Sequence, residues 1–283
     1  MRKWLEYFFE EMEFPAEAKE ALLKDYVAIS VCPGFSYPLY LYENDQPVAH
    51  QRMQKWLSNV SPAYGVHPYA ALFLLYCCMA RHLKEKYEAR GLSMEIWKDS
   101  MKDSRCKLME CHNMYGIWGS FVTFWIPRFF EMTCFGLGRL EFEVIPSPIA
   151  GPEMKKGEPV INVHIPSRGP LYENEVDDAF AKAKMFFASQ VPKGIIVCHS
   201  WLLNPDYPRF LGDKSRVLAF MKRFTIESVE EEPGFGDCWR LFNVEYDGHP
   251  ENLPRNTTFQ RAYADWLMAG HVAKSGIGWL KVE

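Results

Sequence analysis

The chain has 283 residues, a net charge of −4 and a composition that is 48% hydrophobic and 15% aromatic. This length and apolar content are sufficient for one large core or two ordinary ones, which argues against a disordered chain. The small negative charge gives no electrostatic reason to expect nucleic acid or an anionic membrane as a partner.

The eight cysteines show no paired short spacing, and Cys77 and Cys78 are adjacent within an apolar run. We therefore expect reduced thiols and a cytoplasmic location. Cys106, Cys111 and His112 are close together but lack the spacing of a paired zinc motif, so we predict thiols without a metal.

The sequence indicates neither a signal peptide nor a membrane-spanning helix. Glutamates between positions 6 and 13 interrupt the apolar core that a signal peptide needs. The apolar run at 70–80 is shorter than the ~20 residues of a membrane span, and we predict a buried helix that begins at Pro68.

Residues 1–134 are predicted to form a helical domain. Apolar residues at helical spacing indicate one helix over 4–12, a second around 53–57 and a third over 67–87. The aromatic segment 37–42 is bracketed by turn residues and is predicted as a loop or short strand.

The end of this helical region and the start of the next domain are marked by two changes. The aromatic segment 117–132 is expected to form a buried helix that kinks or restarts at Pro127. From position 136 the apolar period changes from helical to two, which is typical of a strand.

Residues 135–283 are predicted to form a sheet domain flanked by helices. The expected strands are 138–144, 160–165, 195–200, 224–229, 238–245 and 277–282, and the expected helices are 176–187, 215–221 and 258–269. Strands that bracket helices after a helical first half indicate an α+β protein with a mixed sheet.

The segment 160–204 forms the most regular unit, since a strand, a turn, an amphipathic helix and a second strand follow one another. Such a unit often holds a phosphorylated ligand in its turn, where backbone N–H groups meet the start of the helix. The turn contains Ser167, Arg168 and Gly169.

Five runs in the second half resemble one bacterial family of acyltransferases: LGRLEFE at 137–143, VINVHIPS at 160–167, GPL at 169–171, VCHSWLL at 197–203 and the segment 215–224. Its members join a helical N-terminal domain to a domain similar to the GNAT superfamily of acyl-CoA N-acyltransferases. The resemblance implies a helical domain over 1–134, a GNAT-like domain over 135–283, and acetyl-CoA or another acyl-CoA as the acyl donor. The acceptor would be a small-molecule amine, and the sequence does not indicate an oligomeric state.

The resemblance places coenzyme A at the turn of Ser167, Arg168 and Gly169, where backbone N–H groups and a guanidinium would meet the pyrophosphate. The superfamily usually has more glycine in this turn. Here Pro170 removes a backbone donor, and acidic residues between 173 and 178 would repel a phosphate. A purely structural turn is the alternative interpretation.

Candidate proton acceptors lie on neighbouring predicted strands. If those strands are adjacent, Glu143, His164 and His199 share one polar face with Glu141 and Asn162. Carboxylates and imidazoles are the groups from which a general base is drawn. The alternative is a face of hydrogen-bonded residues without a catalytic role.

The dipeptide His199-Ser200 does not predict a nucleophilic serine, because adjacent residues of a strand point to opposite faces. Tyr207 lies near the position where the superfamily often has a tyrosine that protonates the leaving thiolate. Two neighbouring prolines instead favour a rigid loop and a surface tyrosine.

Two functions follow from the sequence. The first is acyl-CoA-dependent transfer to an unidentified amine by direct attack. The second is a GNAT-like scaffold without catalysis that binds a small molecule or a partner, because the coenzyme turn is poor in glycine.

Overall fold

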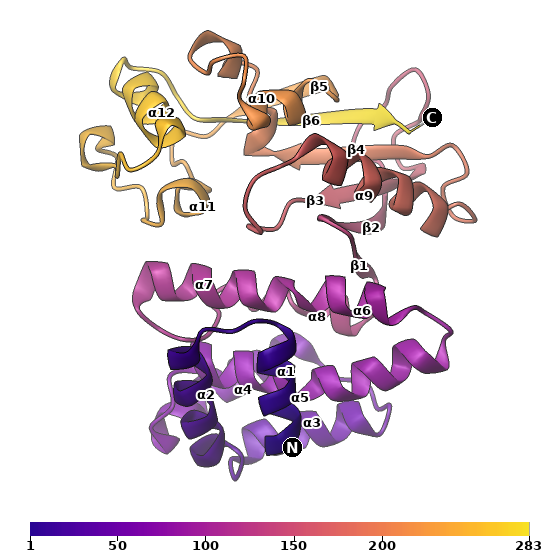
Figure 1. The fold of residues 1–283 in the computed structure, drawn as a ribbon, viewed down its shortest axis with the longest axis vertical. Helices are drawn as coiled ribbons and strands as arrows, with labels where there is room; N and C mark the ends of the chain where they lie inside the picture. The colour runs from indigo at the N-terminus through magenta and orange to yellow at the C-terminus, as the bar shows by residue number, and fades with distance from the viewer. Residues whose placement is uncertain (283) are drawn as a thin grey trace. The chain divides into compact units, whose positions relative to one another are not determined.

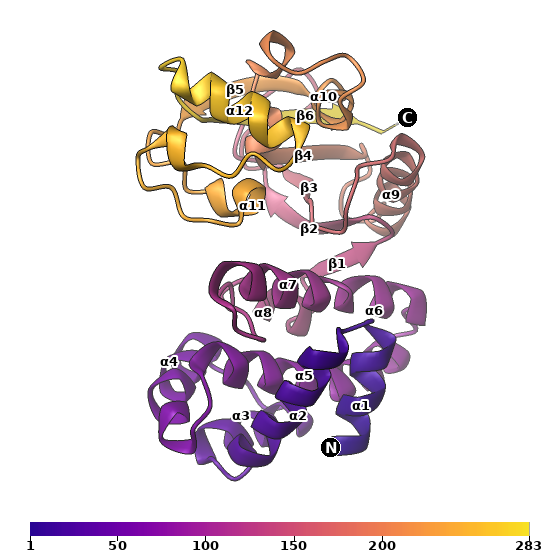
Figure 2. The same cartoon turned by 60° about the vertical axis from the view of Figure 1, so that its left-hand side comes forward.

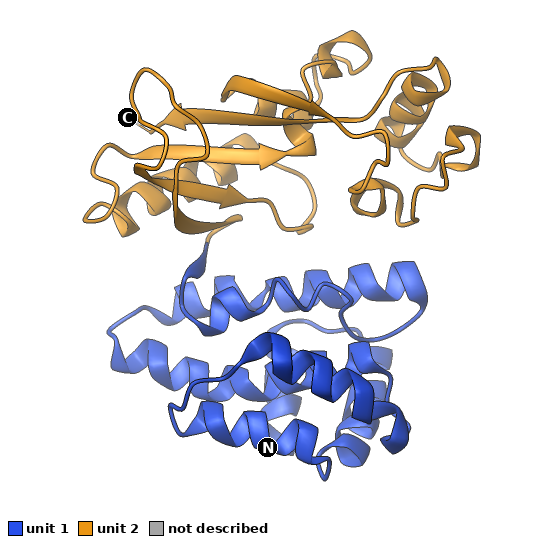
Figure 3. Cartoon of the chain, turned by 180° about the vertical axis from the view of Figure 1, so that it is seen from behind, with its two compact units in different colours: residues 1–136 blue, residues 137–283 orange. Residues whose placement is uncertain are grey.

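The computed structural model of the protein describes residues 1–282. The chain divides into two compact units, Met1–Gly136 and Leu137–Glu283, called unit 1 and unit 2 (Figure 3). The division falls two residues after the predicted boundary at 134. A helical unit followed by a mixed sheet with helices confirms the predicted α+β class.

Unit 1 is built from helices (Figure 1). They are α1 (Arg2–Glu11), α2 (Ala16–Ile29), α3 (Pro33–Glu43), α4 (His50–Val60), the short 3₁₀ helix η1 (Ser61–Tyr64), α5 (Pro68–Ala89), α6 (Met94–Met101), α7 (Asp103–Tyr115) and α8 (Pro127–Phe130). α5 is the central element, because every residue from 70 to 80 is buried.

The boundaries of α5 follow from its sequence. Pro68 occupies its first turn, where a missing N–H costs nothing, and the His67 side chain caps it by accepting a hydrogen bond from the Tyr69 N–H. Among residues 1–282, no single helix is long and apolar enough to cross a membrane. The helices over 50–64 and 68–89 meet that test only as a pair bent by 115°.

The aromatic core of unit 1 joins α6 to α1. Trp97 of α6 is fully buried, and its ring centroid lies 6.2 Å from the rings of both Trp4 and Phe8 of α1. The predicted amphipathic helix at the N-terminus is confirmed, since α1 buries Leu5 and Phe9 together with Phe8.

Two predictions for unit 1 are wrong. The segment 37–42 lies inside α3, which contains Pro38 and buries Phe35 and Tyr42. Burial of that apolar face outweighs the turn residues that flank it. Residues 117–126 form turns and bends instead of a buried helix, and only the restart at Pro127 is found, as the short α8.

Unit 2 is organised around a six-stranded mixed sheet in the order β1-β2-β3-β4-β6-β5. The strands are β1 (Cys134–Leu137), which crosses the division between the units, β2 (Leu140–Pro146), β3 (Pro159–His164), β4 (Ile195–Ser200), β5 (Thr225–Glu231) and β6 (Lys274–Lys281). β3 and β4 pair in parallel, whereas β2 with β3, β4 with β6 and β5 with β6 pair antiparallel.

The remaining elements of unit 2 are helical. They are α9 (Glu173–Phe186), η2 (Trp201–Leu203), η3 (Tyr207–Arg209), α10 (Arg216–Met221), α11 (Cys238–Phe242), η4 (Pro250–Asn252) and α12 (Thr258–Met268). The predicted strand over 238–245 is wrong, since this segment forms α11 and ends at Asn243 in a left-handed conformation. α11 and α12 lie together at one end of the unit, away from α9 (Figure 2).

α9 connects the two parallel strands and covers one face of the sheet. Its buried residues include Val176, Ala179 and Phe180, and the Phe180 ring centroid lies 6.3 Å from that of Phe142 on β2. Helical spacing of apolar residues on α9 and alternation along β2 thus produce one shared core, as the sequence predicted.

Candidate functional site

The face of the sheet opposite to Phe142 carries the polar residues predicted from the sequence. Glu141 is opposite His164, and Glu143 is opposite Asn162, in the antiparallel pair of β2 and β3. Directly opposite residues share a face, so these side chains lie on one side of the sheet. The parallel register of β3 with β4 brings His199 to the same side. We call this side the His164 face.

The two halves of the His164 face differ in polarity. Toward the start of β3 it is apolar, with a cluster made by Met154, Val160, Ile195 and Val197 together with the partly buried Ile145, Ile149 and Trp279. Toward the end of β3 it carries the carboxylates and imidazoles. This polar half lies at the carboxyl ends of the parallel strands, which is where α/β sheets commonly bind ligands.

The pairing between β3 and β4 stops before either strand ends. The two strands are in register at Ile161–Ile196 and Asn162–Val197, and within the described residues they are paired only there. Both strands continue beyond these pairs, β3 as far as His164. Backbone groups at a point where neighbouring strands part can pair with an extended ligand as with an added strand.

An imidazole and a carboxylate are hydrogen-bonded at this point. His164 Nε2 lies 2.9 Å from Glu143 Oε1, and Asn162 Nδ2 lies 3.1 Å from His164 Nε2 and 3.5 Å from Glu143 Oε1. The amide nitrogen of Asn162 can only donate, so the consistent assignment has both His164 Nε2–H and the amide directed at the carboxylate. The basic lone pair of the neutral imidazole then belongs to Nδ1.

The other predicted residues of β4 have separate surroundings. His199 is exposed, and its Nε2 lies 3.5 Å from Ser275 Oγ on β6. The Ser200 hydroxyl caps η2 by accepting a hydrogen bond from the Leu202 N–H at 3.1 Å. Cys198 is buried, and this burial raises the pKa of its thiol, which therefore stays protonated near neutral pH.

The predicted coenzyme turn lies between β3 and α9. Its backbone is sharply turned, with the Arg168 N–H donating to Pro166 O at 2.8 Å. Gly169 has a φ of 90°, a conformation that favours glycine, and an added Cβ there would have no heavy atom within 4 Å. Ser167 and Gly169 therefore belong to a turn whose shape requires this glycine.

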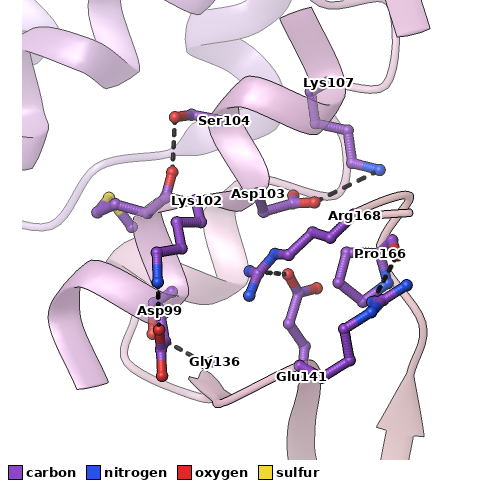
Figure 4. Close-up of polar contacts among 12 residues, drawn as sticks. Asp99, Lys102, Asp103, Ser104, Lys107, Gly136, Glu141, Pro166 and Arg168 are labelled. Carbon is purple, nitrogen blue, oxygen red and sulfur yellow. Dashed lines mark hydrogen bonds and ion pairs between the residues drawn. The ribbon is translucent and has the colours of Figure 1, made fainter. Parts of the chain in front are cut away.

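Arg168 is directed differently from the prediction that its guanidinium meets a pyrophosphate. Its Nη1 donates to Gly138 O at 3.0 Å, and its Nη2 forms an ion pair with Glu141 Oε1 at 3.1 Å (Figure 4). The Glu141 side chain is only 2% exposed. Arg168 thus ties the turn to the connection between β1 and β2.

Arg139, which was not among the residues predicted for the site, contacts the same turn. Its Nη1 donates to Pro166 O at 2.9 Å and its Nη2 to Gly169 O at 2.8 Å. Arg139 is buried and follows Gly138 in the short connection between β1 and β2. The only signal in the sequence was an arginine next to a turn glycine within the LGRLEFE run.

The first turn of α9 combines acidic residues with a basic partner. Tyr172 is its N-cap and, in the part of the chain that the structure describes, no side chain caps it. Glu173 and Glu175 favour the positive end of the helix dipole. Arg223 bonds to Asp177 and lies near Glu173, which offsets part of the acidic charge at this end of the helix.

Tyr207 is buried, so its prediction as a surface residue is wrong. Its hydroxyl donates to Trp201 O at 2.8 Å, and its ring lies within an aromatic cluster with Phe210 and Tyr263. Burial raises the pKa of Tyr207 well above its usual range. The surrounding aromatic packing explains why the two prolines nearby do not expose it.

Unit 1 has a small pocket of its own. It has a volume of about 30 Å³, room for about two water molecules. Its walls are largely aromatic and apolar, and they also include Ser100, Asp103, Ser104 and Lys107. On α7, Cys106 and Cys111 are buried, and the His112 ring stacks on Trp118 at 3.5 Å.

Fold and site together define a two-domain protein of the acyltransferase class. Unit 1 matches the model of the N-acyltransferase N-terminal domain over residues 4–132, and the sheet unit matches the GNAT-like C-terminal domain over residues 134–280. The second match covers more than half of the chain, so the protein belongs to the family with this GNAT-like C-terminal domain. The predicted family is confirmed.

Solved structures of similar fold come from acyltransferases. A complex with decanoyl-CoA and teicoplanin has a TM-score of 0.74 and 20% identity, a complex with decanoyl-CoA alone has 0.73 and 20%, and one with CoA and 10C-teicoplanin has 0.70 and 19%. In each case the match covers 97% of this chain and 86% of the other. No curated protein is significantly similar to the chain.

Proposed function

We propose that the protein is an acyl-CoA-dependent N-acyltransferase that transfers an acyl group to a small-molecule amine. The observation that carries the proposal is the hydrogen-bonded pair of His164 and Glu143 at the point where β3 and β4 part. A general base must lie within reach of the bound acceptor, and this pair is on the polar half of the His164 face.

The proposed donor is an acyl thioester of coenzyme A. Its pantetheine arm would lie where β3 and β4 part, and its pyrophosphate would meet the backbone of the turn at Ser167, Arg168 and Gly169. The solved complexes of similar fold contain CoA, decanoyl-CoA and teicoplanin, which supports a CoA thioester as the donor and a small molecule as the acceptor.

In the proposed reaction the amine nitrogen attacks the thioester carbonyl carbon, the carbon–sulfur bond breaks, and coenzyme A leaves as the thiolate. The proton of the attacking nitrogen passes to Nδ1 of His164, directly or through water, and then to the thiolate sulfur. Glu143 accepts the hydrogen bond from Nε2–H and stabilises the imidazolium that forms. His199, on the same face, is the alternative acceptor.

Direct attack is favoured over a covalent enzyme intermediate. Cys198 lies between Val197 and His199 on β4, so its thiol points to the face of the sheet opposite to the proposed site. Burial also raises its pKa and disfavours the nucleophilic thiolate. The eight cysteines are buried, and the location that we propose is the cytoplasm, where thiols stay reduced.

The first experiment measures CoA release from acetyl-CoA and decanoyl-CoA with a panel of primary amines. His164→Gln is expected to reduce kcat by about 10²- to 10⁴-fold, the usual contribution of a general base, with little change in melting temperature. His249→Gln is the matched control, because His249 also contacts a glutamate, at 3.2 Å from Glu251, but is exposed.

Two outcomes would change the proposal. A His199→Gln variant that loses more activity than His164→Gln would transfer the role of base to His199. Saturable CoA binding without release of CoA for any amine would instead favour the scaffold without catalysis. The single glycine of the turn and the contacts of Arg168 with Gly138 and Glu141 are also consistent with that scaffold.

A further inference from the structure

The turn proposed to meet the pyrophosphate is held by the side chain of Arg139 in addition to its own hydrogen bond from the Arg168 N–H to Pro166 O. Arg139 donates its two terminal nitrogens to two carbonyl oxygens of the turn, Pro166 O at 2.9 Å and Gly169 O at 2.8 Å. These carbonyls belong to residues on either side of Ser167 and Arg168. A planar guanidinium fork suits such a two-point contact, which an ammonium group cannot reproduce.

These two hydrogen bonds fix the direction of the peptide groups in the turn. A trans peptide is planar, so when Pro166 O points at Arg139 the N–H of Ser167 points the opposite way. The Gly169 carbonyl also points at Arg139 and is thereby turned from the opposite surface of the turn. The negative ends of both dipoles are thus kept away from a phosphate approaching that surface.

A second arginine joins the same two segments. Arg168 of the turn contacts the connection between β1 and β2, which contains Arg139. It donates to Gly138 O at 3.0 Å and pairs with Glu141 at 3.1 Å. Gly138 has a φ of 70°, and an added Cβ would lie 3.4 Å from Asp178 of α9. The connection between β1 and β2 is therefore fitted closely to α9 and to the turn.

We infer that Arg139 is a positioning residue for coenzyme A: it orients the turn of residues 166–169 so that the turn recognises the pyrophosphate. This role rests on the proposed function. It assigns pyrophosphate recognition to an oriented backbone instead of the Arg168 guanidinium, and it gives the LGRLEFE run a part in binding the donor.

The test compares two ligands that differ in the group concerned. Isothermal titration measures Kd for coenzyme A and for acetyl-pantetheine, which lacks the pyrophosphate, with wild type and Arg139→Met. We expect Kd for coenzyme A to rise about tenfold or more, as when two charge-assisted hydrogen bonds that orient a site are lost. Kd for acetyl-pantetheine should change by less than about twofold.

Two further variants keep the result interpretable. Arg139→Lys keeps the charge but not the fork, and it should still weaken coenzyme A binding selectively; it decides the question if Arg139→Met does not fold. Arg240→Met is the control, since Arg240 contacts the Asp237 side chain and the Trp239 ring in α11. It should leave both Kd values unchanged.

The outcomes separate this inference from the proposed function. Equal weakening of both ligands in the Arg139 variants, or an unchanged Kd for coenzyme A, would overturn the positioning role and leave the proposed function standing. A wild-type protein that binds neither ligand would overturn the proposed function, and the positioning role with it.

Discussion

The two units place their buried charged groups in different ways. On α7 of unit 1 a buried lysine pairs with acidic residues of its own helix: Lys107 Nζ lies 3.7 Å from Asp103 Oδ1 (Figure 4) and 3.1 Å from Glu110 Oε2. These partners are three or four residues apart. A helix alone brings such residues together.

In unit 2 the polar contacts join separate elements. Arg139 reaches a carbonyl 27 residues away, and Glu143 reaches His164 across 21 residues. These partners meet only when the strands and the turn have taken their places in the sheet. The buried ion pairs of α7 are thus local, whereas the polar contacts around β2, β3 and the turn of unit 2 depend on topology.

The apolar cores differ in the same sense. α5 is buried on all sides over residues 70–80 because other helices surround it. The unit 2 sheet is covered by α9 on one face, and half of the opposite face is polar. The neighbouring helices cover the side chains of α5 over residues 70–80. A sheet whose strands part can instead expose a set of polar side chains to a ligand.

The strongest test of packing in unit 1 is Trp97→Ala. Trp97 is fully buried against Trp4 and Phe8, so we expect the free energy of unfolding to fall by about 3–5 kcal/mol. Urea unfolding followed by circular dichroism measures it. Trp56→Ala is the control, because Trp56 is 41% exposed and should cost far less. Equal losses would show that the aromatic core is not what stabilises the unit.

A buried histidine of unit 1, His50, predicts that the stability of the protein depends on pH. Burial lowers the pKa of His50, partly opposed by Glu131, and His50 Nδ1 lies 3.2 Å from the Tyr76 hydroxyl. The folded state therefore favours the neutral imidazole. Its contribution is complete above the unfolded pKa of 6.5 and is lost as the pH falls through the lower folded pKa.

We expect the wild-type free energy of unfolding to fall more than that of His50→Asn between pH 7.5 and pH 5, because the wild type loses the contribution of its neutral imidazole over this range and the variant does not. Urea titrations at both pH values measure the difference. His249→Asn, at an exposed histidine, should keep the wild-type dependence. A His50→Asn variant with an unchanged pH dependence would contradict the assignment.

The smallest expected effect concerns the backbone of the turn between β3 and α9. Gly169→Ala adds a side chain in open space but at a φ of 90°, so strain alone should destabilise the protein by about 1 kcal/mol. Gly212→Ala is the matched control, because an added Cβ there is also in open space and no positive φ is present. Thermal unfolding compares the two. Similar melting temperatures for both variants would remove the requirement for glycine in the turn.

Several features of the candidate site could be predicted because they depend on period and order. Alternation along β2 and β3 placed Glu143 and His164 on one face, and the strand, turn, helix and strand over 160–204 predicted the parallel pair. The hydrogen bond between Glu143 and His164 could not be predicted. It depends on the register of the two strands, and a shift of one residue would separate the pair.

Three of the wrong predictions share one cause. Turn residues around 37–42 and the apolar segment 238–245 have local preferences that differ from the helices α3 and α11 found there. Tyr207 is buried although two prolines adjoin it. In each case packing against distant residues outweighed the local preference, because burial of a large apolar side chain is worth about 1.5–3 kcal/mol.

The sequence by itself determined the class of the protein, the change from a helical to a sheet region, and the order of elements around the turn at 167–169. Those properties follow from local periodicity and from runs of residues. The tertiary structure decided that Arg168 pairs with Glu141, that Arg139 donates to two carbonyl oxygens of the turn, and that the imidazole of His164 meets a carboxylate. Such contacts join residues far apart in the chain, and only the assembled sheet brings them within hydrogen-bonding distance.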